Sequence, residues 1–317
     1  MQYAPSLFRE LKSIVDNNRE QYGKWILTGS QKFSFMHNVS ESLAGRIRIL
    51  HLETLSACEL RECAIINKAK TVNFVWQGGY PELWANDNLN ITDFFADYVQ
   101  TYLERDLRNI INVTNLRCFQ RFLIICASRI GQLLNFVDLN KDVGVSLSTV
   151  KKWITVLEAS GIIYLLTPYY NNLGKRLVKA PKLYFADHGL LCYLLNIHDM
   201  QMWEASTYRG LIWENLVLTE LLKTGYFTPG RNIFFYRDQN GVEIDLILEI
   251  NNTVILIEAK SQENYANSKL SFHKVAGLFS NRQTSCFLAC TAAIEEIVLL
   301  KNYGVFNPLY LDLIKIL

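Results

Sequence analysis

Two short apolar segments separated by two asparagines constrain the fold of this 317-residue chain more than any other feature. Residues 241–249 and 253–260 are rich in Ile, Val and Leu, and each is short enough to cross a core once as a strand. Asn251 and Asn252 between them are typical of a turn, so the sequence predicts a β-hairpin. Because side chains i and i+2 of a strand share a face, Glu258 and Lys260 project the same way, and the hairpin can bring Asp245 opposite them.

Two carboxylates and an amine on one face of a sheet suit the chemistry of phosphate esters. Asp245 and Glu258 are predicted to bind Mg²⁺, which takes oxygen ligands and keeps several waters. The ion would lower the pKa of a bound water, and Lys260 would position that water or hold a phosphate oxygen. An Asp followed by Glu-x-Lys on the next strand resembles the PD-(D/E)XK nuclease-like superfamily. The alternative interpretation is a solvent-exposed Glu/Lys pair on a hairpin edge.

The segment upstream of the hairpin extends this resemblance. Residues 209–222 have apolar residues at helical spacing and precede a strand predicted at 232–237. The superfamily places an acidic residue on the helix before its sheet, and Glu214 matches that position, although Glu220 on the same helix competes with it. The resemblance implies Mg²⁺-assisted hydrolysis of DNA by Asp245, Glu258 and Lys260, with Glu214 supporting the metal. The same fold is often kept as a binding platform, so activity stays open.

Composition limits the classes of protein to which this chain can belong. Half of the residues are hydrophobic and 20% are charged, which indicates a globular protein of two or three domains. The net charge is +2, so any nucleic-acid surface must be local. The seven cysteines form no CxxC pair and no zinc spacing with histidine, which favours buried free thiols in a reducing cytosol. No apolar run approaches membrane-spanning length, so we expect a cytoplasmic protein with no membrane span.

Four motifs occur in the first third of the chain. They are WILTGSQ (residues 25–31), SESLAGR (40–46), GGYPEL (78–83) and YVQTYLERDLR (98–108). Their order resembles that of prokaryotic AAA-type ATPases with a DUF4143 carboxyl-terminal region, and the resemblance covers nearly the whole chain. It implies that Thr28, Ser30 and Gln31 match a sensor strand that contacts the γ-phosphate or the attacking water. Arg46 matches an arginine that stabilises charge near a nucleotide.

The sequence departs from that family at its beginning. A complete member begins with a P-loop, GxxxxGK[ST], and this sequence contains no such motif. Met1-Gln2 stands where a Walker-B strand would end, and the match resumes at Tyr3. We therefore expect a truncated family member, from a gene fragment, a late start codon or a split gene, without autonomous ATP hydrolysis. The four sensor-like residues would be vestigial, and ATP would be a cofactor only of the full-length family.

Residues 132–187 are predicted to form a winged helix. The pattern is a short helix, a turn containing Gly144, a second helix over residues 147–159, a strand over 162–166, and a loop that returns through a strand at 182–187. The exposed cations suit DNA, because recognition helices enter the major groove and wing cations contact phosphates. These cations are Lys151 and Lys152 on the helix and Lys175 and Arg176 in the loop, with Lys179 and Lys182 extending the patch. Winged helices also serve protein contacts, which is the alternative interpretation.

Together these observations predict an α/β multidomain protein. Residues 1–85 would be the residual carboxyl-terminal part of an AAA-like ATPase core, 86–200 a helical and winged-helix domain, and 201–317 a PD-(D/E)XK nuclease-like domain with a mixed central sheet. DNA is the predicted partner, alongside a P-loop ATPase partner or a second copy of the chain. Two other functions remain open: a non-catalytic DNA-binding or regulatory module, and a protein-interaction subunit that docks on a separate P-loop ATPase part.

Overall fold

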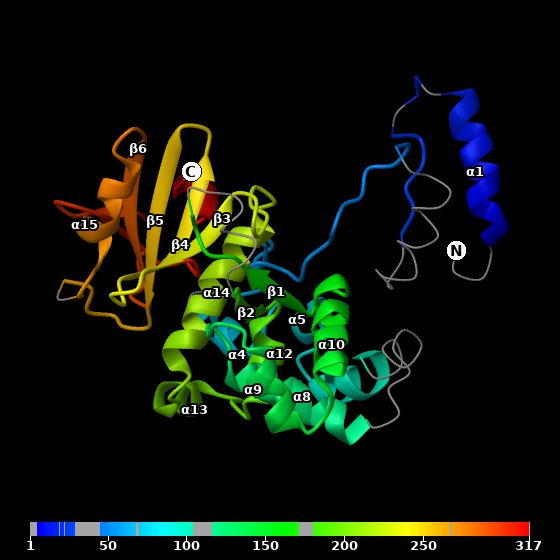
Figure 1. The fold of residues 1–317 in the computed structure, drawn as a ribbon, viewed down its shortest axis with the longest axis horizontal. Helices are drawn as coiled ribbons and strands as arrows, with labels where there is room; N and C mark the ends of the chain where they lie inside the picture. The colour runs from blue at the N-terminus through cyan, green and yellow to red at the C-terminus, as the bar shows by residue number, and fades with distance from the viewer. Residues whose placement is uncertain are drawn as a thin grey trace.

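The computed structural model describes residues 5–18, 20–21, 23–28, 45–67, 70–103, 116–170, 180–266 and 268–316. Figure 1 shows a helical body in the centre, a β-sheet on one side of it, and helix α1 (Pro5–Asn17) on the other side, well away from the sheet. Among the described residues, no helix is long and apolar enough to cross a membrane.

A mixed six-stranded sheet forms the carboxyl-terminal part of the protein, as predicted. Its strand order is β3-β4-β5-β6-β8-β7, with β3, β4 and β5 antiparallel and β5, β6 and β8 parallel. The predicted hairpin is present, because β4 and β5 turn at Asn251, whose φ of 52° lies in the left-handed region that asparagine tolerates. The bounds are β3 Ile233–Arg237, β4 Glu243–Ile250, β5 Thr253–Lys260, β6 Gln283–Cys290, β7 Val298–Leu299 and β8 Gly304–Phe306.

Two elements of this region are shorter than the sequence predicts. The strand expected over residues 305–311 ends at Phe306, because the buried Asn307 side chain accepts the backbone N–H of Leu309 and so folds the chain into a turn. The helix expected over 268–279 is limited to α15 (Phe272–Val275) and a 3₁₀ helix (Ala276–Phe279). The predicted helix before the sheet is confirmed as α14 (Arg209–Lys223), which packs against β5.

The central body consists of helices joined by short connections. Polar side chains begin several of them: Ser56 and Glu59 form a capping box at α3, and Asn135 and Ser146 accept backbone N–H groups at α9 and α10. The bounds are α3 Ala57–Glu62, α4 Phe74–Gln77, α5 Pro81–Ala85, α6 Ile91–Asp97, a π-helix Tyr98–Leu103, α8 Leu116–Ser128, α9 Phe136–Val143, α10 Leu147–Ala159, α12 His188–Leu194 and α13 Met200–Ala205.

Helices α9 and α10 are followed by a small antiparallel sheet. Helix α9 ends at Val143 and is capped by Gly144, whose φ of 79° only glycine adopts readily, and α10 begins at Leu147. Strand β1 (Ile163–Leu166) pairs with β2 (Lys182–Phe185), and Leu133 forms an isolated bridge with Lys182. The element order is that of the sequence prediction, and residues 171–179 of the intervening loop lie outside the described residues.

The apolar segments 24–31 and 47–52 predict two strands near the amino terminus, and neither forms in the residues that the structure describes. Residues 24–28 and 47–52 have no strand structure, and their apolar side chains face solvent: Ile26 is 87% exposed, Leu50 77% and Leu52 94%. A strand needs a neighbour that takes its backbone hydrogen bonds and covers its apolar face, and the described residues supply none here. The strand prediction is therefore wrong for residues 24–28 and 47–52, while residues 29–31 of the first predicted strand lie outside the described residues.

Helices α4 and α12 approach each other closely at two glycines. A Cβ atom added at Gly189 would lie 2.5 Å from the carbonyl oxygen of Gln77 and 2.8 Å from the Cα of Gly78. We expect Gly189→Ala to lower the free energy of unfolding by about 1–3 kcal/mol, because backbone atoms cannot yield as a flexible side chain can. Urea denaturation measures this. Gly277→Ala is the matched control, since nothing lies within 4 Å of its added Cβ. Equal stability of the two variants would contradict the close packing.

Candidate active site

The hairpin brings the three residues singled out in the sequence to one point. Leu246 stands opposite Ile257, so the next positions along the register place Asp245 opposite Glu258. The Nζ atom of Lys260 lies 3.7 Å from Oδ2 of Asp245 and 3.4 Å from Oε2 of Glu258. Both acids are buried, at 8% and 3% exposure, and Lys260 is half-buried. The ammonium group therefore sits between two carboxylates from neighbouring strands.

Backbone N–H groups hold both carboxylates in place. Oδ2 of Asp245 accepts the N–H of Ala259 at 2.8 Å, and Oε1 of Glu258 accepts the N–H of Ser271. Burial raises the pKa of Glu258. Burial by itself would lower the pKa of Lys260, but the charges of Asp245 and Glu258 outweigh it and the pKa is raised. Lys260 therefore remains an ammonium ion at neutral pH.

Glu214 approaches the same region from α14. Its Oε1 atom accepts the Tyr184 hydroxyl and also the Lys182 ammonium, whose Nζ lies 3.1 Å away. Glu214 and Asp245 line a common cavity of about 590 Å³, together with Lys182, Glu243 and Arg237. Burial, and then the charge of Asp245, raises the pKa of Glu214 to about 7. Glu214 thus titrates close to neutral pH.

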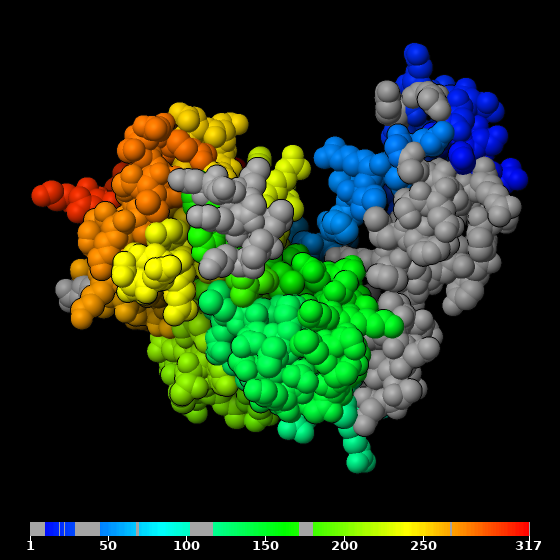
Figure 2. Space-filling model, in the orientation of Figure 1, coloured from blue at the N-terminus to red at the C-terminus, as the bar shows by residue number. Residues whose placement is uncertain are grey.

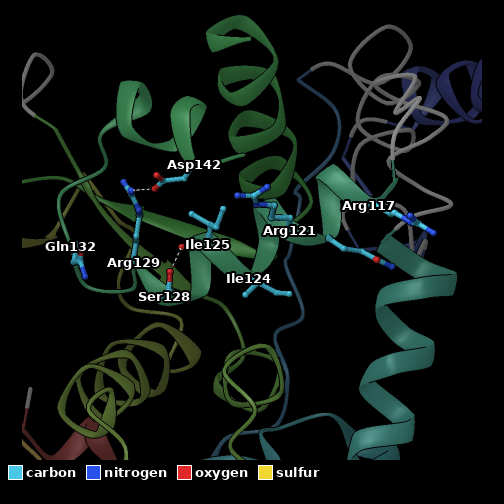
Figure 3. A pocket seen from close by; sticks show the side chains of 9 residues that line it. Arg117, Arg121, Ile124, Ile125, Ser128, Arg129, Gln132 and Asp142 are labelled. Atoms are coloured by element: carbon cyan, nitrogen blue, oxygen red, sulfur yellow. Dashed lines mark hydrogen bonds and ion pairs between the residues drawn. The ribbon is translucent and has the colours of Figure 1, made fainter. Parts of the chain in front are cut away.

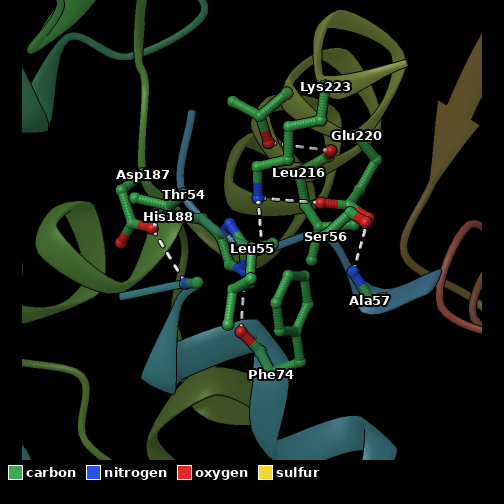
Figure 4. Close-up of polar contacts among 12 residues, drawn as sticks. Thr54, Leu55, Ser56, Ala57, Phe74, Asp187, His188, Leu216, Glu220 and Lys223 are labelled. Carbon is green, nitrogen blue, oxygen red and sulfur yellow. Dashed lines mark hydrogen bonds and ion pairs between the residues drawn. The ribbon is translucent and has the colours of Figure 1, made fainter. Parts of the chain in front are cut away.

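The competing acid on α14, Glu220, has a different place. Its Oε2 atom accepts the backbone N–H of Ala57 at 2.9 Å, and its Oε1 atom pairs with Lys223 at 2.9 Å. Figure 4 shows Glu220 and Lys223 gathered around residues 54–57. Glu220 therefore fixes the segment that leads into α3, whereas Glu214 faces the Asp245 cavity.

Three residues at or beside the cavity escape the sequence patterns: Lys182 and Glu243, which line it, and Tyr184, whose hydroxyl donates to Glu214. Lys182 is predicted to belong to the basic DNA patch, and this prediction is wrong, because Lys182 is 3% exposed and forms ion pairs with Glu214 and Glu243. Burial would lower its pKa, but the charges of Glu214, Glu243 and Asp245 outweigh it and raise the pKa. The alternation of side chains along β2 indicates that Lys182 and Tyr184 share a face of the strand. It does not predict which part of the protein packs against that face.

The donor set can be compared with what a metal ion requires. Across the described residues, no group of three or more His, Cys, Asp or Glu side chains is arranged to hold a metal ion. Asp245 and Glu258 nevertheless form a pair of carboxylates, and Mg²⁺ is commonly bound by one or two carboxylates, with waters and substrate phosphates completing its shell. The pair therefore supplies the number and kind of protein ligands that a Mg²⁺ ion commonly takes.

The remaining predicted site residues lie elsewhere. Lys151 and Lys152 are exposed on α10, as predicted, and Nζ of Lys151 lies 5.9 Å from the centroid of the Phe136 ring. Thr28 is exposed in the segment that forms no strand, and Nε of Arg46 donates to Oδ1 of Asp16 at 2.6 Å. Of the predicted site residues, Ser30, Gln31, Lys175, Arg176 and Lys179 lie outside the described residues.

A second polar cluster links the segment before α3 to the helical body. Oδ2 of Asp187 accepts the Thr54 hydroxyl at 3.0 Å and the Gly79 N–H at 2.9 Å, while Oδ1 caps α12 (Figure 4). The sequence suggests only a cap or turn for Asp187, and this second set of bonds goes beyond it. Nε2 of the neighbouring His188 lies 2.7 Å from the Phe74 carbonyl oxygen, and burial lowers the pKa of His188 to about 4. These bonds hold the segment before α3 against α12 and the rest of the helical body.

Comparison with known proteins adds three family matches. Residues 1–61 match the family described as AAA domain (AAA_14), residues 69–201 match Domain of unknown function (DUF8612), and residues 209–291 match Domain of unknown function (DUF4143). The composite cavity therefore combines Lys182 from the DUF8612 match with Glu214 and Asp245 from the DUF4143 match.

The chain is also similar to two curated relatives and one solved structure. Uncharacterized protein Rv2008c of Mycobacterium tuberculosis and Uncharacterized protein Mb2031c of Mycobacterium bovis are each 29% identical over 261 residues, which cover 82% of this chain and 57% of the relative. The chain thus spans little more than half the length of these relatives. The structure is an assembly of McrB AAA+ hexamers with bound McrC from Thermococcus gammatolerans, at 10% identity and a TM-score of 0.22, covering 60% of this chain and 46% of that one. The resemblance of this chain to AAA-type ATPases with a DUF4143 carboxyl-terminal region is confirmed by its matches to both the AAA and the DUF4143 families.

Proposed function

We propose that this chain binds DNA and that Asp245, Glu258, Lys260 and Glu214 form a Mg²⁺-dependent site of the PD-(D/E)XK type for phosphodiester hydrolysis. The observation that carries the proposal is the Lys260 ammonium, which lies 3.4 and 3.7 Å from two buried carboxylates of adjacent strands. Burying charged groups is costly, and a cluster of them beside an open cavity is typical of a functional site. A solvent-exposed pair on a hairpin edge would not bury both acids.

Each side chain has a role that follows from its surroundings. Asp245 and Glu258 would hold Mg²⁺, which when bound supplies charge stabilisation for the phosphate and acidifies a water. Lys260 would orient that water or hold a phosphate oxygen as a point charge. Glu214, with a pKa near 7, would support the metal and can exchange a proton near neutral pH.

DNA binding is proposed for the region of α9, α10, β1 and β2. The element order supports a winged helix, in which α10 would be the recognition helix. Five apolar side chains of α10 are buried, namely Val150, Trp153, Ile154, Val156 and Leu157. Lys151 and Lys152 are exposed and available to phosphates. Binding that depends on these cations would weaken steeply as salt is raised.

The catalytic proposal is tested with supercoiled plasmid DNA, the full-length chain, and Mg²⁺ or Mn²⁺ against EDTA. We expect metal-dependent nicking by the unmodified chain and its loss in Asp245→Ala, because one of the two proposed metal ligands is gone. Glu204→Ala removes an exposed acid from α13 and serves as the control, with unchanged nicking. Circular dichroism establishes that both variants are folded. Undiminished nicking by Asp245→Ala would rule out the catalytic role, and salt-sensitive binding without cleavage would favour a DNA-binding or regulatory module.

A second candidate function rests on the exposed apolar residues near the amino terminus. Ile26, Leu50 and Leu52 would be covered if residues 24–28 and 47–52 paired with the sheet of a P-loop ATPase partner. Light scattering of this chain mixed with a recombinant P-loop-bearing half of a family member tests the idea. A complex that Ile26→Asp and Leu50→Asp abolish would support docking, whereas self-association would identify a second copy of the chain as the partner. A chain that stays monomeric in the mixture would contradict docking.

A further inference from the structure

A basic groove runs along α8, apart from the exposed lysines of α10. It has a volume of about 860 Å³, and its lining includes Arg117, Arg121, Ser128, Arg129 and Gln132. Figure 3 shows Arg117, Arg121, Arg129 and Gln132 following one another across the groove. Positions 117 and 121 are four residues apart on one helix, so their side chains share a face. Arginines thus mark out a line rather than a scattered patch.

The charges of this groove are only partly compensated. Arg129 forms an ion pair with Asp142 of α9. Arg117 and Arg121 are exposed, and neither forms an ion pair within the part of the chain that the structure describes. Two exposed arginines beside serine and glutamine side chains suit a phosphate backbone, which proteins contact with arginines, hydroxyls and amides. Because the net charge of the chain is only +2, a surface that attracts DNA has to be a local cluster of cations such as this one.

The groove and the Glu214–Asp245 cavity meet at one residue. Gln132 lines both of them, and the cavity also holds Lys182 and Glu243. On the face drawn in Figure 2, the green surface of the helical body adjoins the yellow surface of the sheet region. From Arg117 to Ser128, the last residue of α8, the helical rise amounts to about 17 Å. At the spacing of B-form DNA that length corresponds to about five phosphates of one strand.

We propose that the α8 groove is the path along which the phosphate backbone of a DNA strand reaches the Glu214–Asp245 cavity. The inference rests on the DNA binding proposed above and adds the route of the substrate. The cavity itself holds several acids, which repel a phosphate, so contacts outside it must hold the backbone in position. Arg117 and Arg121 supply those contacts. Gln132, which lines both the groove and the cavity, marks the junction between them. Lys151 and Lys152 do not line the groove and would contact the DNA separately.

Fluorescence anisotropy with a labelled DNA duplex over a salt series tests the path. We expect Arg117→Gln/Arg121→Gln to make the slope of log Kobs against log salt shallower by about 2, because about 0.9 is lost for each phosphate contact removed. Arg231→Gln/Lys301→Gln removes two exposed cations outside the groove and should leave the slope unchanged. Gln132→Glu should weaken binding and slow nicking by adding a negative charge at the junction. Gln201→Glu, an exposed position on α13, is its control.

The outcomes separate the path from the proposed function. If the unmodified chain binds no DNA, both fail. If Lys151→Ala/Lys152→Ala weakens binding while Arg117→Gln/Arg121→Gln behaves like its control, the path is overturned and DNA binding stands. If the arginine variant binds more weakly but Gln132→Glu binds and nicks like the unmodified chain, DNA contacts α8 without entering the cavity, and the path is again overturned.

Discussion

Replacing Trp213 by alanine is expected to lower the free energy of unfolding by about 3–5 kcal/mol. Trp213 is fully buried where α14 meets the sheet, and its ring centroid lies 6.5 Å from that of the buried Trp203. Its Nε1 atom donates to the carbonyl oxygen of Ala289 at 3.1 Å. Alanine would leave a cavity and also a buried carbonyl without its donor, and both effects destabilise the fold.

Urea denaturation followed by circular dichroism measures this loss without depending on tryptophan fluorescence. The matched control is Trp25→Ala, because Trp25 is 49% exposed and is expected to change stability by less than about 0.5 kcal/mol. A Trp213→Ala chain as stable as the Trp25→Ala chain would show that α14 does not pack on the sheet through this residue. Such a result would also remove the physical basis for placing Glu214, the next residue on α14, beside the hairpin.

The parts of the fold that could be predicted are those whose cause is local. The hairpin follows from two apolar segments and an Asn-Asn turn, and α14 follows from helical spacing of apolar residues. The convergence of Asp245, Glu258 and Lys260 needs only two rules, the alternation of side chains along a strand and the pairing of adjacent strands in a hairpin. These rules operate within about 16 residues, so a pattern in the sequence is sufficient.

The parts that could not be predicted depend on contacts between distant segments. Lys182 and Tyr184 reach Glu214 from positions 32 and 30 residues earlier in the chain. Their place is set by Asn215, whose buried side chain accepts the N–H of Phe185 at 2.8 Å and donates to its carbonyl oxygen at 3.1 Å. These two hydrogen bonds attach β2 to α14, and the spacing of apolar residues in either segment does not predict them. A lysine in a basic stretch therefore looked like a DNA contact although it is buried against two acids.

The second prediction is that stability falls as pH rises through neutrality because of Glu214. Its pKa is about 7 in the folded protein, against an ordinary value of 4.5. Between these values the folded chain holds a proton that the unfolded chain has lost, so the free energy of unfolding decreases with rising pH. The stabilisation is fully present below pH 4.5 and is lost as pH rises through 7, by about 3 kcal/mol in all. Lys182 remains charged when Glu214 is protonated, because Glu243 is its second partner.

Glu214→Gln isolates this contribution, because glutamine keeps the size of the side chain and does not titrate. Urea denaturation at pH 5, 6, 7 and 8 should show a stability difference between the unmodified chain and Glu214→Gln that shrinks or reverses as pH rises. Other buried groups are present in both chains, so their contributions to the pH dependence cancel in the stability difference. Glu258, with its raised pKa, also lowers stability as pH rises. His188, with a pKa of about 4, has the opposite effect. Glu204→Gln, at an exposed position, should give a constant difference. A constant difference for Glu214→Gln as well would show that Glu214 is already ionised throughout this range, and that its proton is not available to the chemistry proposed for the cavity.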